Sequence, residues 1–151
     1  MLAELRIAAV AETTAETAVM LLQAQLQEHD IVSSQESLRA VVERVRTDTG
    51  EGFMLLATYS DQAAGIAFAA AHLSAEHGGT IGWLEELYIV PALRGRGVGS
   101  ALLGDVIMRA RHLGWRAVEL EVVAGHERAV PLYMRHGFTA ANRARFTCAL
   151  Q

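Results

Sequence analysis

The sequence predicts a mixed α/β fold, in a single domain that covers residues 1–151. Segments with the pattern of strands alternate with segments with the pattern of helices, and residues 80–123 follow the order strand, helix, strand. A Gly-rich stretch, PALRGRGVGSALL, joins the strand and the helix of this unit. The length of 151 residues and the hydrophobic content of 52% suit one domain with a sizeable core.

In the N-terminal third of the chain we expect one strand and two helices. Residues 5–10 read as a short strand, and residues 11–30 as a helix with Val19, Leu22 and Leu26 at helical spacing. A second helix follows in SSQESLRAVVERVR, where Ser34 is the expected N-cap and the apolar residues mark one face.

The middle of the chain predicts antiparallel strands. Residues 51–59 form one strand, the turn SDQ follows, and AAGIAFAAAHLS returns as its partner in a hairpin. A second turn, AEHGG, leads into the long strand TIGWLEELYIV.

In the C-terminal third, a helix after the Gly-rich stretch is expected to end near Gly114. RAVELEVV alternates apolar and polar residues as a strand does. HERAVPLYMRH reads as a short helix that Pro131 kinks and Gly137 ends. FTAANRARFTCAL reads as a final strand or hairpin, with Cys148 as a small core residue.

Composition argues against several classes of partner. The net charge of −4 disfavours nucleic acid as the main partner, because nucleic-acid binding usually requires a basic face. No apolar run is long enough to span a bilayer, and the N-terminal residues lack the pattern of a signal peptide. A single cysteine provides neither an internal disulfide nor a metal framework. We therefore expect a cytoplasmic protein with no metal, no membrane partner and no nucleic-acid partner.

The Gly-rich stretch predicts an anion site at the start of a helix. The first N–H groups of a helix lack intrahelical acceptors, and the helix dipole is positive at this end. Glycines let a bulky ligand approach the backbone, and the arginine forks of Arg94 and Arg96 can hold phosphate oxygens.

The spacing of the glycines separates the possible anions. A P-loop requires a lysine, and this turn has none. A dinucleotide-binding fingerprint fits at Gly95 and Gly97 but has Ser100 in its third position, although Glu119 follows at a suitable distance. A dinucleotide-binding domain therefore stays as a weaker alternative.

Two motifs resemble those of the GNAT family of N-acetyltransferases. LEELYIVPALRGRGVGSALL is similar to the family's acetyl-CoA signature, whose loop pattern [QR]-x-x-G-x-[GA] reads here Arg94-x-x-Gly97-x-Gly99. The second motif is ERAVPLYMRHGF, which carries the family's Ala-x-x-[LF]-Tyr phrase ahead of Gly-Phe. The resemblance implies the GNAT fold, a central mixed and mostly antiparallel sheet flanked by helices.

The resemblance also implies acetyl-CoA as co-substrate and an amine of a small molecule or peptide as acceptor. Amide groups of the pantetheine arm are expected to pair with the strand at Leu87, Tyr88 and Ile89. The residues expected to hold the pyrophosphate are Arg94, Gly95, Arg96, Gly97, Val98, Gly99 and Ser100.

Catalytic roles follow from the same resemblance. An alkylamine is mostly protonated at neutral pH, so a carboxylate is needed to take its proton. Side chains alternate along a strand, so Glu85 and Glu86 are expected on opposite faces; we assign the base to Glu85 and keep Glu86 as the alternative. Tyr133 matches the family's general acid. His126 stands where the family often has a cofactor-binding Asn, so its role as a cofactor contact is a prediction with a changed side chain.

Two further possibilities remain open from the sequence. A chain with this fold can bind acyl-CoA as a sensor without turnover. Homodimers through C-terminal strands are common in the family, so a homodimer is a possible state of this chain.

Overall fold

The structure is a computed structural model that describes residues 4–151. The chain forms two compact units, one reaching to Glu121 and the other comprising Val122–Gln151.

The first unit is built on one five-stranded sheet with the order β1-β2-β3-β4-β5. The strands are β1 (Leu5–Ala9), β2 (Gly52–Tyr59), β3 (Gln62–Ser74), β4 (Gly79–Ile89) and β5 (Val118–Glu119). The first four are antiparallel to their neighbours, and β5 runs parallel to β4. The predicted mixed, mostly antiparallel sheet is confirmed.

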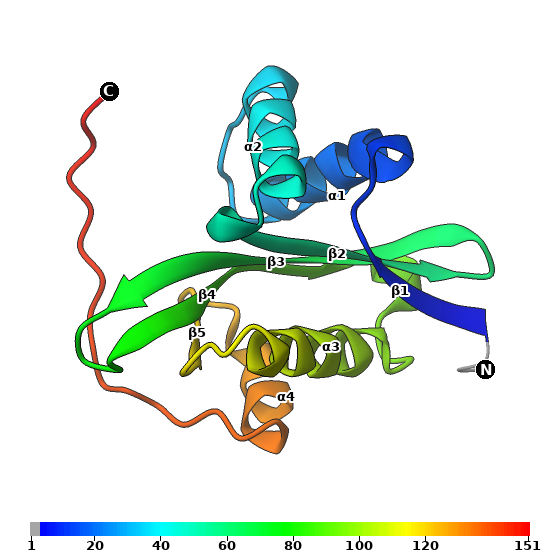
Figure 1. Cartoon of the computed structure of the whole chain (residues 1–151). Coiled ribbons are helices and arrows are strands. Elements are labelled where there is room, and N and C mark those ends of the chain that lie inside the picture. The colour runs from blue at the N-terminus through cyan, green and yellow to red at the C-terminus, as the bar shows by residue number, and fades with distance from the viewer. Residues whose placement is uncertain (1–3) are drawn as a thin grey trace. The chain divides into compact units, whose positions relative to one another are not determined.

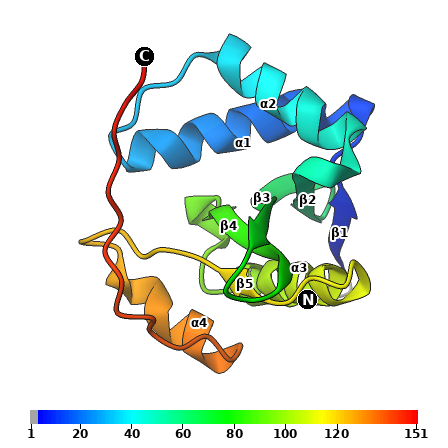
Figure 2. The same ribbon diagram turned by 60° about the vertical axis from the view of Figure 1, so that its left-hand side comes forward.

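Helices cover both faces of this sheet (Figures 1 and 2). Helices α1 (Ala15–Glu28) and α2 (Gln35–Thr47) lie on one face, and α3 (Val98–His112) lies on the other. The main core cluster fills the space between α1, α2 and the sheet, with fully buried Val19, Val42 and Ile66 at its centre.

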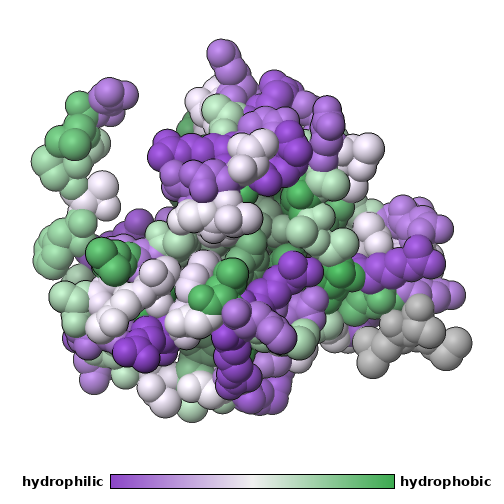
Figure 3. Space-filling view, in the orientation of Figure 1, coloured by the Kyte–Doolittle hydropathy of each residue, from purple (hydrophilic) through white to green (hydrophobic). Residues whose placement is uncertain are grey.

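Local chemistry accounts for two of the predicted boundaries. Ser34 caps α2, because its hydroxyl oxygen accepts a hydrogen bond of 3.0 Å from the N–H of Ser37. Ser60 and Asp61 both adopt positive φ, which is the backbone of a tight turn that matches the twist of a β-hairpin. The surface over α2 is largely hydrophilic, as expected for a helix with only one buried face (Figure 3).

The strand predicted in RAVELEVV is much shorter in the structure. β5 comprises only Val118 and Glu119, which pair with Gly82 and Trp83 of β4. The alternation of apolar and polar residues extends further than the pairing does. A strand exists only where a neighbouring backbone satisfies its hydrogen bonds, and the sequence pattern does not report that neighbour.

The second unit contains one short helix, α4 (Val130–Arg135), after a 3-10 turn at Glu127–Ala129. The predicted kink at Pro131 is wrong, because Pro131 lies in the first turn of α4, where the missing N–H has no cost. Gly137 ends the helix with φ +91°, as predicted.

Residues 138–151 form neither the predicted strand nor a hairpin. Cys148 is exposed, which corrects its assignment to the core. Phe146 and Leu150 are about nine-tenths exposed, and apolar side chains stand on the surface of this segment (Figure 3). Alternating apolar residues are present here without a paired strand, so their pattern alone does not make one.

In the part of the chain that the structure describes, no helix combines the length and the apolar character that crossing a bilayer requires. Across residues 4–151, no three His, Cys, Asp or Glu side chains gather where they could hold a metal ion.

Candidate active site

The Gly-rich stretch forms an open turn at the N-terminus of α3. Gly95 and Gly97 have φ of +76° and +85°, the left-handed region that other residues rarely adopt. A Cβ atom built on either glycine meets no other atom within 4 Å, so the space above the backbone is open. The first intrahelical hydrogen bond runs from Ala101 N–H to Gly97 O, so the N–H groups of Val98 and Gly99 lie ahead of it at the positive end of the helix.

The side chain of Arg94 holds this turn in place. Its Nε donates to the carbonyl oxygen of Ile89 at 2.9 Å, and its Nη2 forms an ion pair with Glu28 on α1 at 2.6 Å. The guanidinium also lies over the ring of Tyr88, 5.6 Å from the ring centroid. Arg94 was predicted as a cofactor contact, and the structure uses its side chain to join β4, α1 and the turn.

Arg96 differs from Arg94. It is exposed, and it forms no ion pair with any residue of the described chain. Arg96 therefore brings an available positive charge to the same turn as the open glycines.

One edge of β4 has no strand beside it over residues 84–89 within the described sheet. β5 pairs only with Gly82 and Trp83, at the other end of the strand. The N–H of Val90 donates toward β3, to Ala64 O at 2.9 Å. Because the hydrogen-bonding direction alternates along an antiparallel strand, the backbone groups of Leu87 and Ile89 face the uncovered edge.

A β-bulge lies in β4 just before this edge. Phe68 of β3 stands opposite Glu86 and Ala69 stands opposite Leu84, so Glu85 is the extra residue of the bulge. The bulge interrupts the alternation that placed Glu85 and Glu86 on opposite faces. Glu85 is exposed, whereas Glu86 is half-buried.

The surroundings of Glu86 give it an unusual proton affinity. The pKa of Glu86 is raised to about 7, mainly by burial and in smaller part by the charge of Glu85, while a hydrogen bond from the Gln25 side chain opposes the shift. A carboxyl group with such a pKa exchanges protons at neutral pH, as a general base does. No sequence motif predicted the contact between Gln25 and Glu86, because Gln25 belongs to α1, some 60 residues before Glu86 in the sequence.

The chain matches the model of the acetyltransferase (GNAT) family over residues 18–138. It belongs to the GNAT family. The Gly-rich turn and β4 of the first unit and the helix α4 of the second all fall inside the matched range, which confirms the resemblance found in the sequence.

Individual relatives agree with the family. Residues of this chain are 35% identical to mycothiol acetyltransferase of Propionibacterium freudenreichii over 77 residues, which is 51% of this chain and 25% of that protein. The match thus spans only about a quarter of the length of that relative.

Solved structures confirm the GNAT fold. An integron cassette protein from the mobile metagenome of Cole Harbour Salt Marsh superposes with a TM-score of 0.85 at 22% identity, covering 96% of this chain and 90% of its own. Aminoglycoside N-acetyltransferase AAC(6')-Iy, solved in complex with CoA, superposes with a TM-score of 0.83 at 19% identity, covering 97% and 95%.

The second unit carries the other GNAT landmark. Tyr133 is half-buried in α4, and its ring meets that of Phe138 edge-on at 5.9 Å between centroids. Burial raises the pKa of Tyr133, so its phenol is protonated at neutral pH. His126 immediately precedes the 3-10 turn at Glu127–Ala129 and provides no side-chain cap to it.

Proposed function

We propose that this GNAT protein is an acetyl-CoA-dependent N-acetyltransferase that acetylates a primary amine of a small molecule or peptide in a ternary complex. The observation that carries the proposal is the combination, within the first unit, of an uncovered β4 edge, an open Gly-rich turn and a half-buried Glu86 with a pKa of about 7. The aminoglycoside N-acetyltransferase with the same fold, solved with CoA and with a CoA-linked bisubstrate analogue, supports the choice of co-substrate.

The residues of the first unit fit a CoA molecule. The open space above Gly95 and Gly97, with the N–H groups of Val98 and Gly99 and the charge of Arg96, suits a pyrophosphate. Pantetheine is extended and carries amides, so the backbone groups of Leu87 and Ile89 can pair with it as they would with another strand. When bound, acetyl-CoA supplies the activated acetyl thioester.

Of the backbone groups at this edge, one is already occupied. Ile89 O accepts the hydrogen bond from Arg94, so the N–H groups of Leu87 and Ile89 remain as donors. An N–H donor at the thioester carbonyl stabilises the negative charge that develops on its oxygen during attack.

We assign the general base to Glu86 in preference to Glu85. The amine nitrogen forms a bond to the acetyl carbon, the carbon–sulfur bond breaks, and the proton of the amine passes to the Glu86 carboxylate directly or through a water molecule. A pKa of about 7 lets Glu86 be ionised for this step and still bind the proton firmly. The exposed Glu85 contributes its charge to that pKa.

We assign the general acid to Tyr133, which donates its phenolic proton to the departing CoA thiolate. Its raised pKa keeps the proton available at neutral pH. His126 stays a predicted cofactor contact, with an imidazole hydrogen bond in place of an Asn amide. The cytoplasmic location and the homodimer also stay predictions from the sequence.

Ligand binding and turnover test this proposal together. Acetyl-CoA and CoA are expected to raise the melting temperature, because each binds the folded state. Release of CoA thiol across a panel of primary amines is expected for at least one amine. Stabilisation by NAD alone would favour a dinucleotide-binding domain, and stabilisation by acetyl-CoA without thiol release for any amine would favour a sensor.

A further inference from the structure

A second groove lies in the first unit, away from the proposed acetyl-CoA site. Its volume is about 440 Å³, within the range of small-molecule sites. Its lining includes Val45, Arg46, Phe53, Arg109, His112 and Leu113.

The groove passes around the edge of the sheet where β1 ends. β1 pairs with β2 only as far as Ala9 opposite Leu55, followed by one hydrogen bond from Val10 N–H to Met54 O. β2 begins at Gly52, before this point, so its first residues have no strand on that side among the described residues.

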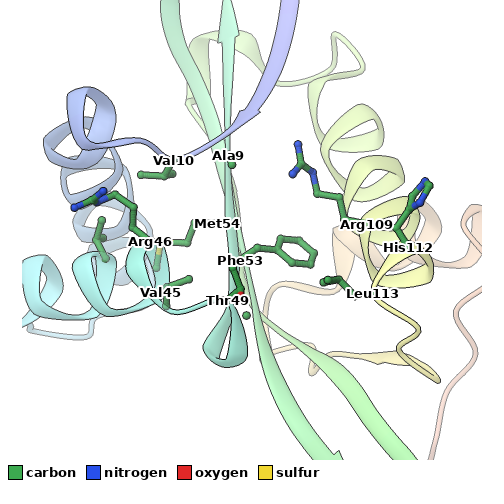
Figure 4. A pocket seen from close by; sticks show the side chains of 12 residues that line it. Ala9, Val10, Val45, Arg46, Thr49, Phe53, Met54, Arg109, His112 and Leu113 are labelled. Carbon is green, nitrogen blue, oxygen red and sulfur yellow. The ribbon is translucent and has the colours of Figure 1, made fainter.

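Residues from different helices form the two sides of the groove at this edge (Figure 4). Val45 and Arg46 of α2 stand on one side of the sheet, and Arg109 and Leu113 stand on the other. Phe53 projects from β2 toward α3 and stacks on Trp115, with 5.3 Å between the ring centroids. The groove therefore has a firm aromatic platform beside a cation.

Arg109 makes the groove positively charged. Arg46 and Arg109 line it, and no acidic residue does. Arg46 is paired with Glu43 at 2.7 Å. Arg109 is half-buried, yet within residues 4–151 it has neither an ion pair nor a side-chain hydrogen bond. A half-buried guanidinium without a carboxylate is uncommon, because its partial desolvation is then uncompensated.

The groove is separate from the Gly-rich turn. Arg109 lies in the last turn of α3, and Val98 opens the same helix. At about 1.5 Å per residue, the two ends are about 16 Å apart along the helix axis. The groove therefore lies at the opposite end of α3 from the proposed pyrophosphate site.

We propose that this groove binds a small organic anion, a carboxylate on an apolar body. The carboxylate pairs with Arg109, and the apolar body lies over Phe53 and Leu113 at the uncovered edge of β2. Apolar surface with a few placed polar groups is the usual composition of such sites. The class follows from the charge: a neutral or cationic ligand leaves Arg109 without a partner.

Arg109 also has a general role that the experiment must separate from binding. Positive charges in the last turn of a helix interact favourably with the helix dipole, and both Arg109 and Arg111 are placed there. Arg111 is exposed and does not line the groove, so it is the matched control.

Calorimetric titration with octanoate tests the proposal on the full chain. We expect a dissociation constant of about 1 mM or lower, the ordinary affinity for a ligand of this size. Octanamide has the same shape without the charge, and its affinity is expected to be about tenfold weaker. Equal affinity for octanoate and octanamide would overturn the proposal. So would the absence of binding heat at octanoate concentrations well above about 1 mM.

Variants locate the site. Arg109→Gln is expected to weaken octanoate binding about tenfold and to leave octanamide unaffected, whereas Arg111→Gln changes neither. Leu113→Phe, at an exposed position on the rim, narrows the groove and is expected to weaken both probes. Equal losses in Arg109→Gln and Arg111→Gln would show that only general charge near the helix end matters, and would refute a site.

Trp115 gives an independent readout of position. In a Trp83→Phe variant it is the only tryptophan, and its ring stacks on Phe53 of the groove. Octanoate is expected to change its fluorescence with the same concentration dependence as the heat. Heat without a change at Trp115 would place octanoate elsewhere and contradict the proposal.

Discussion

Arg94 and Arg96 stand two residues apart in the Gly-rich turn and differ in what their side chains contact. Arg94 bonds to Ile89 and Glu28, whereas Arg96 is exposed and has no ion-pair partner in the described part of the chain. The sequence motif predicted that both arginines contact the cofactor, because a sequence pattern shows the residue type and not the direction in which its side chain points. The structure separates a residue that shapes the turn from one that is available to a ligand.

Arg94→Gln is expected to lower the free energy of unfolding by about 1–2 kcal/mol, since it breaks a half-buried ion pair and a hydrogen bond to backbone. Urea unfolding measures this change. Arg96→Gln is the control: it is expected to leave stability within about 0.5 kcal/mol and to weaken acetyl-CoA binding about tenfold. A loss of stability in Arg96→Gln equal to that in Arg94→Gln would argue against this division.

Glu86→Gln is expected to lower kcat/KM by about 100-fold or more, because the amide cannot accept the proton of the amine. In the wild type, kcat/KM is expected to rise with pH through about 7, where Glu86 becomes ionised, and the variant should lack this step. The pH profile of thiol release at saturating acetyl-CoA measures both. If Glu85→Gln loses as much activity and Glu86→Gln keeps its pH step, the base is Glu85.

The same carboxyl group links stability to pH. The pKa of Glu86 is raised in the folded state from 4.5 to about 7, so between these pH values the folded chain binds a proton that the unfolded chain does not. This stabilising contribution is complete below pH 4.5 and is lost as pH rises toward 7. Glu86→Gln is therefore expected to raise the melting temperature more at pH 8 than at pH 5. An equal change at both pH values would show that the pKa is not shifted.

The periodicity of apolar residues correctly predicted the helices and strands that are defined by contacts close in the sequence. α2 and the β2–β3 hairpin follow their patterns closely, because one apolar face or one tight turn is enough to define them. The bulge at Glu85, the two-residue β5 and the segment 138–151 were not predictable in this way. Each of these features depends on which other strand pairs with the segment, and the alternation of apolar and polar side chains does not predict the pairing.

The turn before α3 gives a prediction for its backbone. Gly97→Ala is expected to lower the free energy of unfolding by about 1 kcal/mol, because an alanine backbone is strained at φ +85° even though the added methyl group contacts no neighbouring atom. Acetyl-CoA affinity is expected to fall as well. Gly97→Asn is the matched control, since Asn tolerates this backbone better and should retain most of the stability. An equal decrease in melting temperature for the two variants would contradict the claim that the positive φ at Gly97 is the cause of the lost stability.

The GNAT motifs of this chain fall in two compact units. The Gly-rich turn and Glu86 belong to the first unit, and Tyr133 belongs to the second. The sequence predicted the family from both motifs together. It did not predict the groove at the β1–β2 edge, because the residues that line it come from separate parts of the chain and share no motif.

Tyr133→Phe tests whether the second unit takes part in the chemistry. Removal of the phenolic proton is expected to lower kcat about tenfold or more while the dissociation constant for acetyl-CoA stays the same. Single-turnover kinetics and calorimetry measure the two quantities separately. Unchanged kcat would remove Tyr133 from the mechanism.

The fate of the acetyl group decides whether this chain is an acetyltransferase. Acetyl-CoA labelled with ¹³C in the acetyl group is incubated with the protein and a panel of primary amines, and the products are analysed by mass spectrometry. At least one amine is expected to gain the label, with one CoA thiol released for each acetylated amine, and Glu86→Gln is expected to slow both together. Acetyl-CoA binding with no label on any amine would contradict this expectation.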